Sequence, residues 1–449
     1  MAIPIALTIA GSDSGGGAGI QADLKTFAAL GVYGASVITS VTAQNTLEVT
    51  GIHDLPAEFV VLQLDTVVRD LTVDAIKTGM LSNPAIIRAV SARLKVLGVE
   101  RLVVDPVMVA KGGAALLRKE AEAELIEGLL PLASVVTPNL AEAEVLAAMP
   151  IRDLSDVERA ARRIYEQGPR HVVVKGGHLE GPPVDVLFDG RTFQYFTGER
   201  IATKSLHGTG CTFASAIAAE LAKGTEVAEA VRSAKAFIAQ AIRLAEPIGH
   251  GFGPTHHLGA LYTQAARYDT LLQLEEAMAR LQAGRIAALM PQGEANLGMA
   301  LPRAATPQEV AAWAGQLVRT GVDVCPTGGL RFGASQHIAA VILTAMRSDP
   351  MYRGAMTIRY GHDVLQACQY ANLRLAQFAR QEAPSEVRQD ECRTLAWGVA
   401  RAIRQIGAVP DVIYDLGDVN QEAMVRVLGR DASDVASKVL LICQHFSPQ

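Results

Sequence analysis

The sequence predicts an α/β protein whose first domain, a mostly parallel sheet flanked by helices, is followed by a second domain. The chain has 449 residues, about three times the usual length of one domain. Its first part alternates short apolar runs with longer amphipathic runs, which is typical of strand–helix units on a parallel sheet. That pattern breaks at the turn-rich segment 248–257 and then restarts. We therefore expect domains 1–265 and 266–449.

Each expected element of the first domain follows from an apolar run or an amphipathic stretch. The segment 183–203 is expected to form a hairpin, and a helix over 269–281 is expected to open the second domain. Strands are expected at 5–10, 34–41, 75–78, 101–104, 134–137 and 171–175, with β-like pieces at 184–188 and 192–197. Helices are expected at 20–30, 57–68, 84–97, 119–130, 139–148, 157–167, 211–223 and 226–244.

Composition indicates an ordinary globular protein of a reducing cytoplasm. Hydrophobic residues make up 49% and charged residues 19% of the chain, and the net charge is −5. This net charge does not indicate binding to nucleic acid or to an anionic membrane surface. The first apolar run ends at Gly11 without a basic start, so we expect a buried strand rather than a signal peptide. The cysteines are odd in number and form no C-x-x-C pair: Cys211, Cys325, Cys368, Cys392 and Cys443.

The segment His207-Gly208-Thr209-Gly210-Cys211 opens a helix of small apolar residues. Its glycines let backbone N–H groups surround an anion, and the helix dipole adds positive potential at the same place. Cys211 then lies in the first turn, where the dipole stabilises a thiolate that can accept a proton. The alternative is a tight helix entry in which Cys211 is a small buried residue.

A glycine-rich loop, residues 11–19, joins the first strand to the first helix. Neither nucleotide fingerprint fits it. A G-x-G-x-x-G pattern begun at Gly15 or Gly17 fails at Ile20 or Ala22, and the P-loop pattern begun at Gly11 lacks its Lys-Ser/Thr. We interpret the segment as a loop whose missing side chains let a small substrate lie against the backbone. The alternative is a flexible connection.

Polar residues follow several apolar strands, as expected if a site lies at the carboxyl edge of the sheet. The amide of Gln44 can pair with a heterocycle. Asp105 can hold Mg²⁺, with Glu142 as a second carboxylate, and Lys175 can bind a phosphate. Each of these residues alone is more often a helix cap or a surface charge. Together with the anion cradle they favour phosphoryl transfer, which depends on positioning, Mg²⁺ and cations.

Several motifs of the first domain resemble the hydroxymethylpyrimidine/phosphomethylpyrimidine kinases of thiamine biosynthesis, in the ribokinase-like superfamily. The resemblance spans roughly residues 3–260 and implies two successive phosphorylations of an aminopyrimidine by MgATP. The residues that carry it are Ala10–Thr26, Ala43-Gln44-Asn45-Thr46, Lys77-Thr78-Gly79-Met80, Asp105-Pro106-Val107-Met108, Thr137-Pro138-Asn139, Lys175-Gly176-Gly177-His178 and His207–Cys211.

The resemblance also implies a role for individual residues. Cys211 is the implied catalytic base, although many ribokinase-like relatives carry Asp at that position. Lys175 serves catalysis as well as the phosphates, and Gly208 to Gly210 form the anion hole. The remaining implied contacts are Gly11, Asp23, Gln44, Met80 and Val107 for the substrate, Asn139, Lys175 and Thr209 for the nucleotide, and Asp105 and Glu142 for Mg²⁺.

The second domain is poor in lysine, since Lys438 is the only one beyond Leu261. A diphosphate site there must therefore draw on Arg or His, and the candidates are Arg331, His337, Arg353 and Arg359. The alternative is that these arginines decorate a surface. A further segment, 411–418, is expected to be a strand that ends in acidic residues, which form either a metal site or a turn.

The motifs around these candidates resemble the ThiN-type thiamine-phosphate synthase domain: residues 291–298, 329–337 and 348–360. The resemblance implies an α/β fold, catalytic roles for Arg331, His337 and Arg359, and the joining of pyrimidine diphosphate to thiazole phosphate with loss of diphosphate. It also implies a homodimer or higher homo-oligomer. Thr357 stands where the family pattern has Asn, and related domains act as ligand sensors. A thiamine-phosphate-sensing second domain is therefore one alternative, and a pyridoxal kinase is another.

Overall fold

The computed structural model describes residues 2–109, 113, 116–177, 181–418 and 421–446. The chain divides into two compact units, Met1–Leu261 and Tyr262–Gln449. The division falls inside the long helix α9 (Gly259–Ala283), which begins ten residues before the helix expected at 269–281. Among the described residues, no helix is both long and apolar enough to cross a bilayer.

Unit 1 is built on a nine-stranded sheet in the order β3-β2-β1-β4-β5-β6-β7-β8-β9. The strands from β2 through β7 run parallel, whereas β3, β8 and β9 are antiparallel to their neighbours. The mostly parallel sheet predicted from the sequence is therefore confirmed. The strands are β1 (Ile5–Asp13), β2 (Tyr33–Gln44), β3 (Val49–Asp54), β4 (Ala75–Thr78), β5 (Leu102–Val104), β6 (Val135–Val136), β7 (Val172–Val174), β8 (Val184–Phe188) and β9 (Phe193–Thr197).

The helices of unit 1 agree with the periodicity of the sequence except in one segment. The helix expected over 119–130 is instead a series of short 3-10, α and π turns that ends at Leu132. Gly128 weakens helix there, and Pro131 provides no N–H for a regular ladder. The regular helices are α1 (Gly19–Ala29), α2 (Ala57–Asp70), α3 (Pro84–Leu97), α5 (Leu140–Ala147), α6 (Leu154–Tyr165), α7 (Thr209–Ala222) and α8 (Val227–Arg243).

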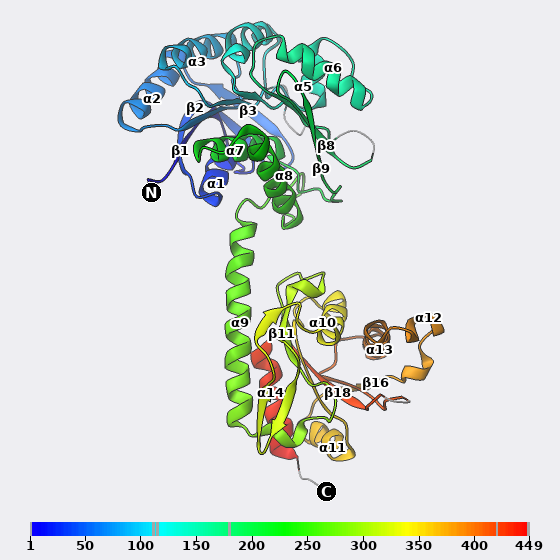
Figure 1. The fold of residues 1–449 in the computed structure, drawn as a ribbon. Coiled ribbons are helices and arrows are strands. Elements are labelled where there is room, and N and C mark those ends of the chain that lie inside the picture. Colours follow the sequence, from blue (N-terminus) through cyan, green and yellow to red (C-terminus); the bar gives the residue numbers. More distant parts are fainter. Residues whose placement is uncertain (1, 110–112, 114–115, 178–180, 419–420, 447–449) are drawn as a thin grey trace. The chain divides into compact units, whose positions relative to one another are not determined.

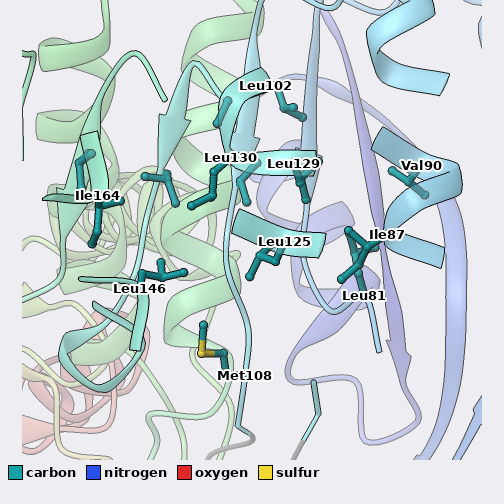
Figure 2. Packing of buried hydrophobic residues seen from close by; sticks show 14 of the residues in the cluster. Leu81, Ile87, Val90, Leu102, Met108, Leu125, Leu129, Leu130, Leu146 and Ile164 are labelled. Atoms are coloured by element: carbon teal, nitrogen blue, oxygen red, sulfur yellow. The ribbon is translucent and has the colours of Figure 1, made fainter. Parts of the chain in front are cut away.

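Alternate residues of the strands face two separate apolar cores. Leu7 and Val104 pack with α2, α3, α5 and α6, whereas Ala6 and Val103 pack with α1, α7 and α8. Figure 1 shows α2 and α3 on one side of the sheet and α1 and α7 on the other. Figure 2 shows part of the first core, where Leu129 lies among neighbouring apolar side chains. Both faces of the sheet are therefore covered, and the carboxyl edge of its parallel strands is left for a site.

Strand β3 was not expected from the sequence. It pairs antiparallel with the extended end of β2 and places Gln44 opposite Val49. Its segment, Val49–Asp54, has few buried side chains, so no regular apolar alternation marks it as a strand. This pairing extends β2 as far as Gln44. The Gln44 side chain therefore lies at the carboxyl edge of the parallel strands, where it lines the cavity described below.

Unit 2 has a seven-stranded sheet in the order β14-β11-β10-β15-β18-β17-β16, with a separate hairpin of β12 and β13. Helices α10 and α13 pack on one face, and α9, α11 and α14 pack on the other. This confirms a second α/β unit. The strands are β10 (Leu297–Ala300), β11 (Val310–Trp313), β12 (Leu317–Thr320), β13 (Asp323–Pro326), β14 (Leu330–Phe332), β15 (Gly354–Arg359), β16 (Leu375–Gln377), β17 (Val412–Asp415) and β18 (Met424–Gly429). The helices that follow α9 are α10 (Gln336–Ser348), α11 (His362–Tyr370), α12 (Ser385–Arg388), α13 (Glu391–Ile406) and α14 (Ala432–His445).

Candidate active site

A cavity of about 790 Å³ lies at the carboxyl edge of the sheet in unit 1. Its walls come from the ends of the parallel strands, the glycine-rich loop and the N-terminus of α7. Every site residue that the sequence indicated in unit 1, apart from Asp23, lines this cavity: Gly11, Gln44, Met80, Asp105, Val107, Asn139, Glu142, Lys175, Gly208, Thr209, Gly210 and Cys211. His178, which belongs to one of the motifs, lies outside the described residues.

The glycine-rich loop is organised by the carboxylate of Asp13, the last residue of β1. This carboxylate accepts hydrogen bonds from the backbone N–H groups of Gly15, Gly17 and Ala18 at 2.8–3.0 Å, and it lies 2.9 Å from Nε2 of His207. Burial acts to raise the pKa of Asp13, but the hydrogen bonds from His207 and the backbone lower it overall. Asp13 was not predicted as a site residue; the available signal was an acidic residue at a strand end inside a glycine-rich run.

The N-terminus of α7 approaches this loop backbone to backbone. Gly208 has φ +79°, and a Cβ atom there would lie 1.8 Å from the carbonyl oxygen of Gly17. Only glycine therefore fits this position. Gly208 provides no side-chain cap, so N–H groups in the first turn of α7 are left to bind an anion. A Cβ atom on Gly210 would lie 3.5 Å from Nζ of Lys175, so the cradle also lies beside a cation.

Two carboxylates and one lysine lie together at the ends of β5, β6 and β7. Nζ of Lys175 lies 3.0 Å from Oδ1 of Asp105. Glu142 forms a capping box with Asn139 at the start of α5, since its Oε2 accepts from the backbone N–H of Asn139 at 2.8 Å. Burial raises the pKa of Glu142 to about 7; Lys175 opposes this rise and the nearby Asp105 adds to it.

The donor chemistry of Asp105 and Glu142 fits Mg²⁺. Mg²⁺ takes oxygen ligands and is usually held by one or two carboxylates together with water and substrate phosphates. Among the described residues, no group of three or more acidic, histidine or cysteine side chains forms a complete metal cage. Both carboxylates are nearly buried, and this burial is the main cause of the high pKa of Glu142.

Cys211 differs from the expectation based on the helix dipole. Burial raises the pKa of its thiol to about 11; Lys77 opposes this rise, while Asp23 and Asp105 add to it. The dipole of α7 is therefore outweighed by desolvation, and the thiol form is favoured at neutral pH. The side chain is only partly shielded and lines the cavity, so it remains within reach of a bound molecule.

Asp23, which the family resemblance implies as a substrate contact, is not among the residues that line the cavity. Its side chain is fully buried. It pairs instead with Lys77, which is also fully buried. An acid on the inner face of α1 must find such a partner, because an unpaired buried charge is costly. The sequence alone did not distinguish this buried pair from a ligand-binding acid.

Gln44 and Met80 lie where the glycine-rich loop meets neighbouring strands. Nε2 of Gln44 lies 3.3 Å from Nε2 of His207, the same ring nitrogen that faces Asp13. A Cβ atom on Gly11 would lie 3.0 Å from Sδ of Met80, so Gly11 permits this close packing. These contacts bring residues from distant parts of the chain to one wall of the cavity.

In unit 2 the cations indicated by the sequence do not form one group. Arg353 precedes β15 and donates to the carbonyl oxygen of Ala300, whereas Arg359 ends β15 and pairs with Asp363. Six residues of β15 separate the two ends, a span of about 20 Å at about 3.3 Å per residue. A single diphosphate therefore does not bridge both. Arg331 is exposed on the edge strand β14.

His337, in the first turn of α10, belongs to a separate cluster of charges. Its Nδ1 lies 2.7 Å from Glu294, and its Nε2 lies 3.4 Å from Glu391. Glu391 in turn lies 3.5 Å from Arg380. We call His337, Glu294, Glu391 and Arg380 the histidine cluster. The sequence analysis missed Arg380, which is nearly buried and lies in a polar segment without a distinctive pattern.

Asp415, at the end of β17, does not form a metal site. It is fully buried and pairs with Arg380 at 2.8 Å and with Arg426 at 2.6 Å. Arg426 lies on β18 opposite Thr357 in the strand register. The acidic end of the predicted strand is therefore the centre of a buried ion-pair network adjoining the histidine cluster. An arginine within the apolar run of β18 was the available signal.

Comparison with known proteins assigns a family to each unit. Residues 13–256 match the phosphomethylpyrimidine kinase family, and residues 273–441 match the thiamine-phosphate synthase ThiN family. The chain is 55% identical over 253 residues to the thiamine biosynthesis bifunctional protein ThiED of Geobacter sulfurreducens, covering 56% of this chain and 52% of that protein. It is 56% identical over 257 residues to a hydroxymethylpyrimidine/phosphomethylpyrimidine kinase of Rhizobium meliloti, covering 56% of this chain and 96% of that protein.

Unit 1 is also similar to solved kinase structures. An ADP complex of Bacillus subtilis pyridoxal kinase is similar with a TM-score of 0.55 and 42% identity, covering 58% of this chain and 99% of that one. Pyridoxal kinase from Staphylococcus aureus in complex with AMP-PCP is similar with a TM-score of 0.54 and 39% identity, covering 58% of this chain and 95% of that one. Unit 1 therefore has the ribokinase-like fold of these two pyridoxal kinases.

The close approach of Gly208 to Gly17 predicts a specific effect of adding one methyl group. We expect Gly208→Ala to lower affinity for a non-hydrolysable ATP analogue at least about tenfold, because the first turn of α7 must move. The matched control is Gly224→Ala. Gly224 also has positive φ, at +86°, but has no neighbour within 4 Å of an added Cβ, so it loses only about 1–2 kcal/mol of stability. Calorimetric titration and thermal denaturation measure both effects, and equal behaviour of the two variants would contradict this account.

The raised pKa of Glu142 predicts a pH dependence of stability. Between about pH 4.5 and 7 the folded state retains a proton that the unfolded state releases, so this group's contribution to stability falls as pH rises through that window. We expect Glu142→Gln to become more stable relative to the parent from pH 5 to pH 8 in Mg²⁺-free buffer, by up to about 3 kcal/mol.

Far-UV circular dichroism during denaturation measures this change for the whole chain. Both tryptophans, Trp313 and Trp397, lie in unit 2, so their fluorescence reports unit 2 separately and must stay unchanged. Glu144→Gln, two residues along the same helix, is the control for the substitution itself. A pH profile of Glu142→Gln parallel to that of the parent would show that Glu142 keeps no extra proton.

Proposed function

The chain belongs to the phosphomethylpyrimidine kinase family, and from this premise we propose that unit 1 phosphorylates hydroxymethylpyrimidine and then its monophosphate, using ATP. The observation that carries the proposal is the gathering of Asp105, Glu142, Lys175 and the uncapped start of α7 around one cavity. Phosphoryl transfer requires these elements: backbone donors for the phosphate oxygens, a cationic clamp and carboxylates for a metal. The product is the pyrimidine diphosphate.

The cavity contains distinct surroundings for the two substrates. Gln44, Val107 and the backbone at Gly11 offer donors, acceptors and a close-packed wall for the flat pyrimidine. Apolar side chains from the second half of unit 1 also line the cavity and suit the adenine ring: Ile201, Phe213, Ile238 and Ile242. Asn139 and Thr209 also line the cavity and complete the nucleotide contacts that the family resemblance implies.

The positions of the charged groups at the centre of the cavity follow from the contacts described above. The N–H groups of Gly208 to Gly210 and the Lys175 ammonium stabilise negative charge on the transferred phosphoryl group. Asp105 and Glu142 would hold Mg²⁺, which would neutralise phosphate charge. Cys211 accepts the proton of the substrate hydroxyl, and the raised pKa of its thiol means that it gains this proton readily but starts from a small thiolate population.

We further propose that unit 2 joins the pyrimidine diphosphate to thiazole phosphate, giving thiamine phosphate and diphosphate. Support comes from the ThiN family match over residues 273–441 and from the histidine cluster beside two buried arginines. His337 contacts Glu294 and Glu391 in this cluster, while Arg331 and Arg359 are separate candidates for binding anionic groups. The product of unit 1 is the substrate of unit 2, which gives the fusion a chemical purpose.

A second candidate for unit 1 is pyridoxal phosphorylation. It is favoured by one specific observation, the 42% identity to the Bacillus subtilis pyridoxal kinase over nearly all of that chain. Pyridoxal and the aminopyrimidine share a flat heterocycle with a hydroxymethyl arm, so one cavity can accommodate both. Relative rates on the two substrates decide which activity dominates. For unit 2 the remaining alternative is a domain that binds thiamine phosphate without turnover.

One assay with the full chain tests both activities. Hydroxymethylpyrimidine, ATP and Mg²⁺ are expected to give the monophosphate and then the diphosphate, and added thiazole phosphate is expected to convert the diphosphate into thiamine phosphate. Mass spectrometry follows each species in time. We expect phosphorylation of pyridoxal to be at least about tenfold slower in kcat/KM, because Gln44 matches the amino-substituted edge of the pyrimidine.

Matched variants separate the two units in this assay. Lys175→Met is expected to stop diphosphate formation while leaving the conversion of supplied diphosphate intact, whereas His337→Ala is expected to do the reverse. Faster phosphorylation of pyridoxal would overturn the assignment of unit 1. Binding of thiamine phosphate without any turnover of supplied diphosphate would overturn the synthase assignment of unit 2.

A further inference from the structure

Lys77, near the end of β4, is a fully buried lysine that the mechanism above does not use. Its Nζ lies 3.0 Å and 2.9 Å from the two carboxylate oxygens of Asp23, and both side chains have 0% exposure. Burying two charges costs several kcal/mol per ion before their attraction offsets it. A buried ion pair therefore adds little net stability to the fold. We infer a role for this pair from its position relative to the groups that react.

The carboxylate end of this pair is held away from the cavity. Asp23 accepts a hydrogen bond from the hydroxyl of Thr8 at 2.6 Å on one oxygen and from the hydroxyl of Ser215 at 2.6 Å on the other. With the two bonds from Lys77, both oxygens are occupied. Asp23 therefore has a fixed orientation between β1, β4 and α7.

The cationic end of the pair faces the cavity. Lys77 is among the lining residues and Asp23 is not, and a Cβ atom on Gly79 would lie 2.7 Å from Nζ of Lys77. Ser215 lies four residues after Cys211 in α7, so both project from the same face of that helix. The ion pair that Ser215 contacts therefore lies on the side of α7 from which Cys211 also projects.

Charged groups from four elements act on Cys211. Lys77 from β4 and Lys175 after β7 favour the thiolate, whereas Asp23 from α1 and Asp105 after β5 disfavour it. Lys77 has the largest effect of these charges on the thiol, larger than that of its own partner Asp23. This order agrees with the geometry, because Lys77 lines the cavity together with Cys211 whereas Asp23 does not.

We propose that Lys77 is a positioning residue for phosphoryl transfer, which stabilises the thiolate of Cys211, while Asp23 keeps Lys77 charged and in place. The proposal rests on the assignment of Cys211 as the proton acceptor. In that step the O–H bond of the substrate hydroxyl breaks and an S–H bond forms. The hydroxyl oxygen bonds to the γ-phosphorus, and the bond from that phosphorus to ADP breaks. The thiol later releases its proton to solvent.

The test measures thiolate reactivity in the full chain without substrates. The double variant Lys77→Met with Asp23→Asn removes both charges and leaves no unpaired ion. We expect the rate of iodoacetamide reaction at Cys211, followed at pH 8.5 by peptide mass spectrometry, to fall at least about threefold. Cys325 in unit 2 serves as the internal reference in the same digests, and Lys25→Met on the exposed side of α1 is the control for losing a nearby lysine.

A second variant distinguishes charge from structure. Asp23→Asn alone disrupts the same network but keeps the lysine, so the reaction at Cys211 is expected to be at least as fast as in the parent. An unchanged or faster rate in the double variant, or an equal fall in Asp23→Asn, would overturn the proposal. Because no kinase substrate is present, neither result depends on which heterocycle the enzyme phosphorylates.

Discussion

The carboxylate of Asp13 is the interaction on which the active site of unit 1 depends. It accepts three backbone N–H groups of the glycine-rich loop and also faces His207, which immediately precedes the anion cradle. Two segments that lie 194 residues apart in the sequence are thereby held together. In this arrangement Gly208 also lies close to the backbone of Gly17, so the loop and the cradle form one structure.

Around the contact between Asp13 and His207, the site buries more charged groups than the stability of the fold requires. Asp105 and Lys175 pair directly, Glu142 has a raised pKa, and Lys77 is buried in an ion pair with Asp23. Each arrangement lowers stability relative to an apolar core but prepares a phosphate and metal environment before substrates enter. Unit 2 shows the same principle at Arg380, Asp415 and Arg426, where a carboxylate holds two arginines beside His337.

Much of unit 1 could be predicted from the sequence, because apolar periodicity and strand-end polar residues are local signals. The strand at 75–78 and the helix at 84–97 match the structure residue for residue. Three features depended on long-range contacts and could not be read locally. Strand β3 forms only by pairing with β2, Asp23 is buried only because Lys77 neutralises it, and the pKa of Cys211 follows desolvation rather than the helix dipole.

Amide hydrogen exchange in an Asp13→Asn variant tests the central claim most directly. If Asp13 joins the two segments, exchange must accelerate together at residues 15–18 and at 208–211, while the β8–β9 hairpin stays protected. Asp189→Asn is the control, because Asp189 likewise accepts backbone N–H groups, those of Arg191 and Thr192, but within that hairpin. Acceleration confined to residues 15–18 would contradict the claim, since the anion cradle would then hold its position without Asp13.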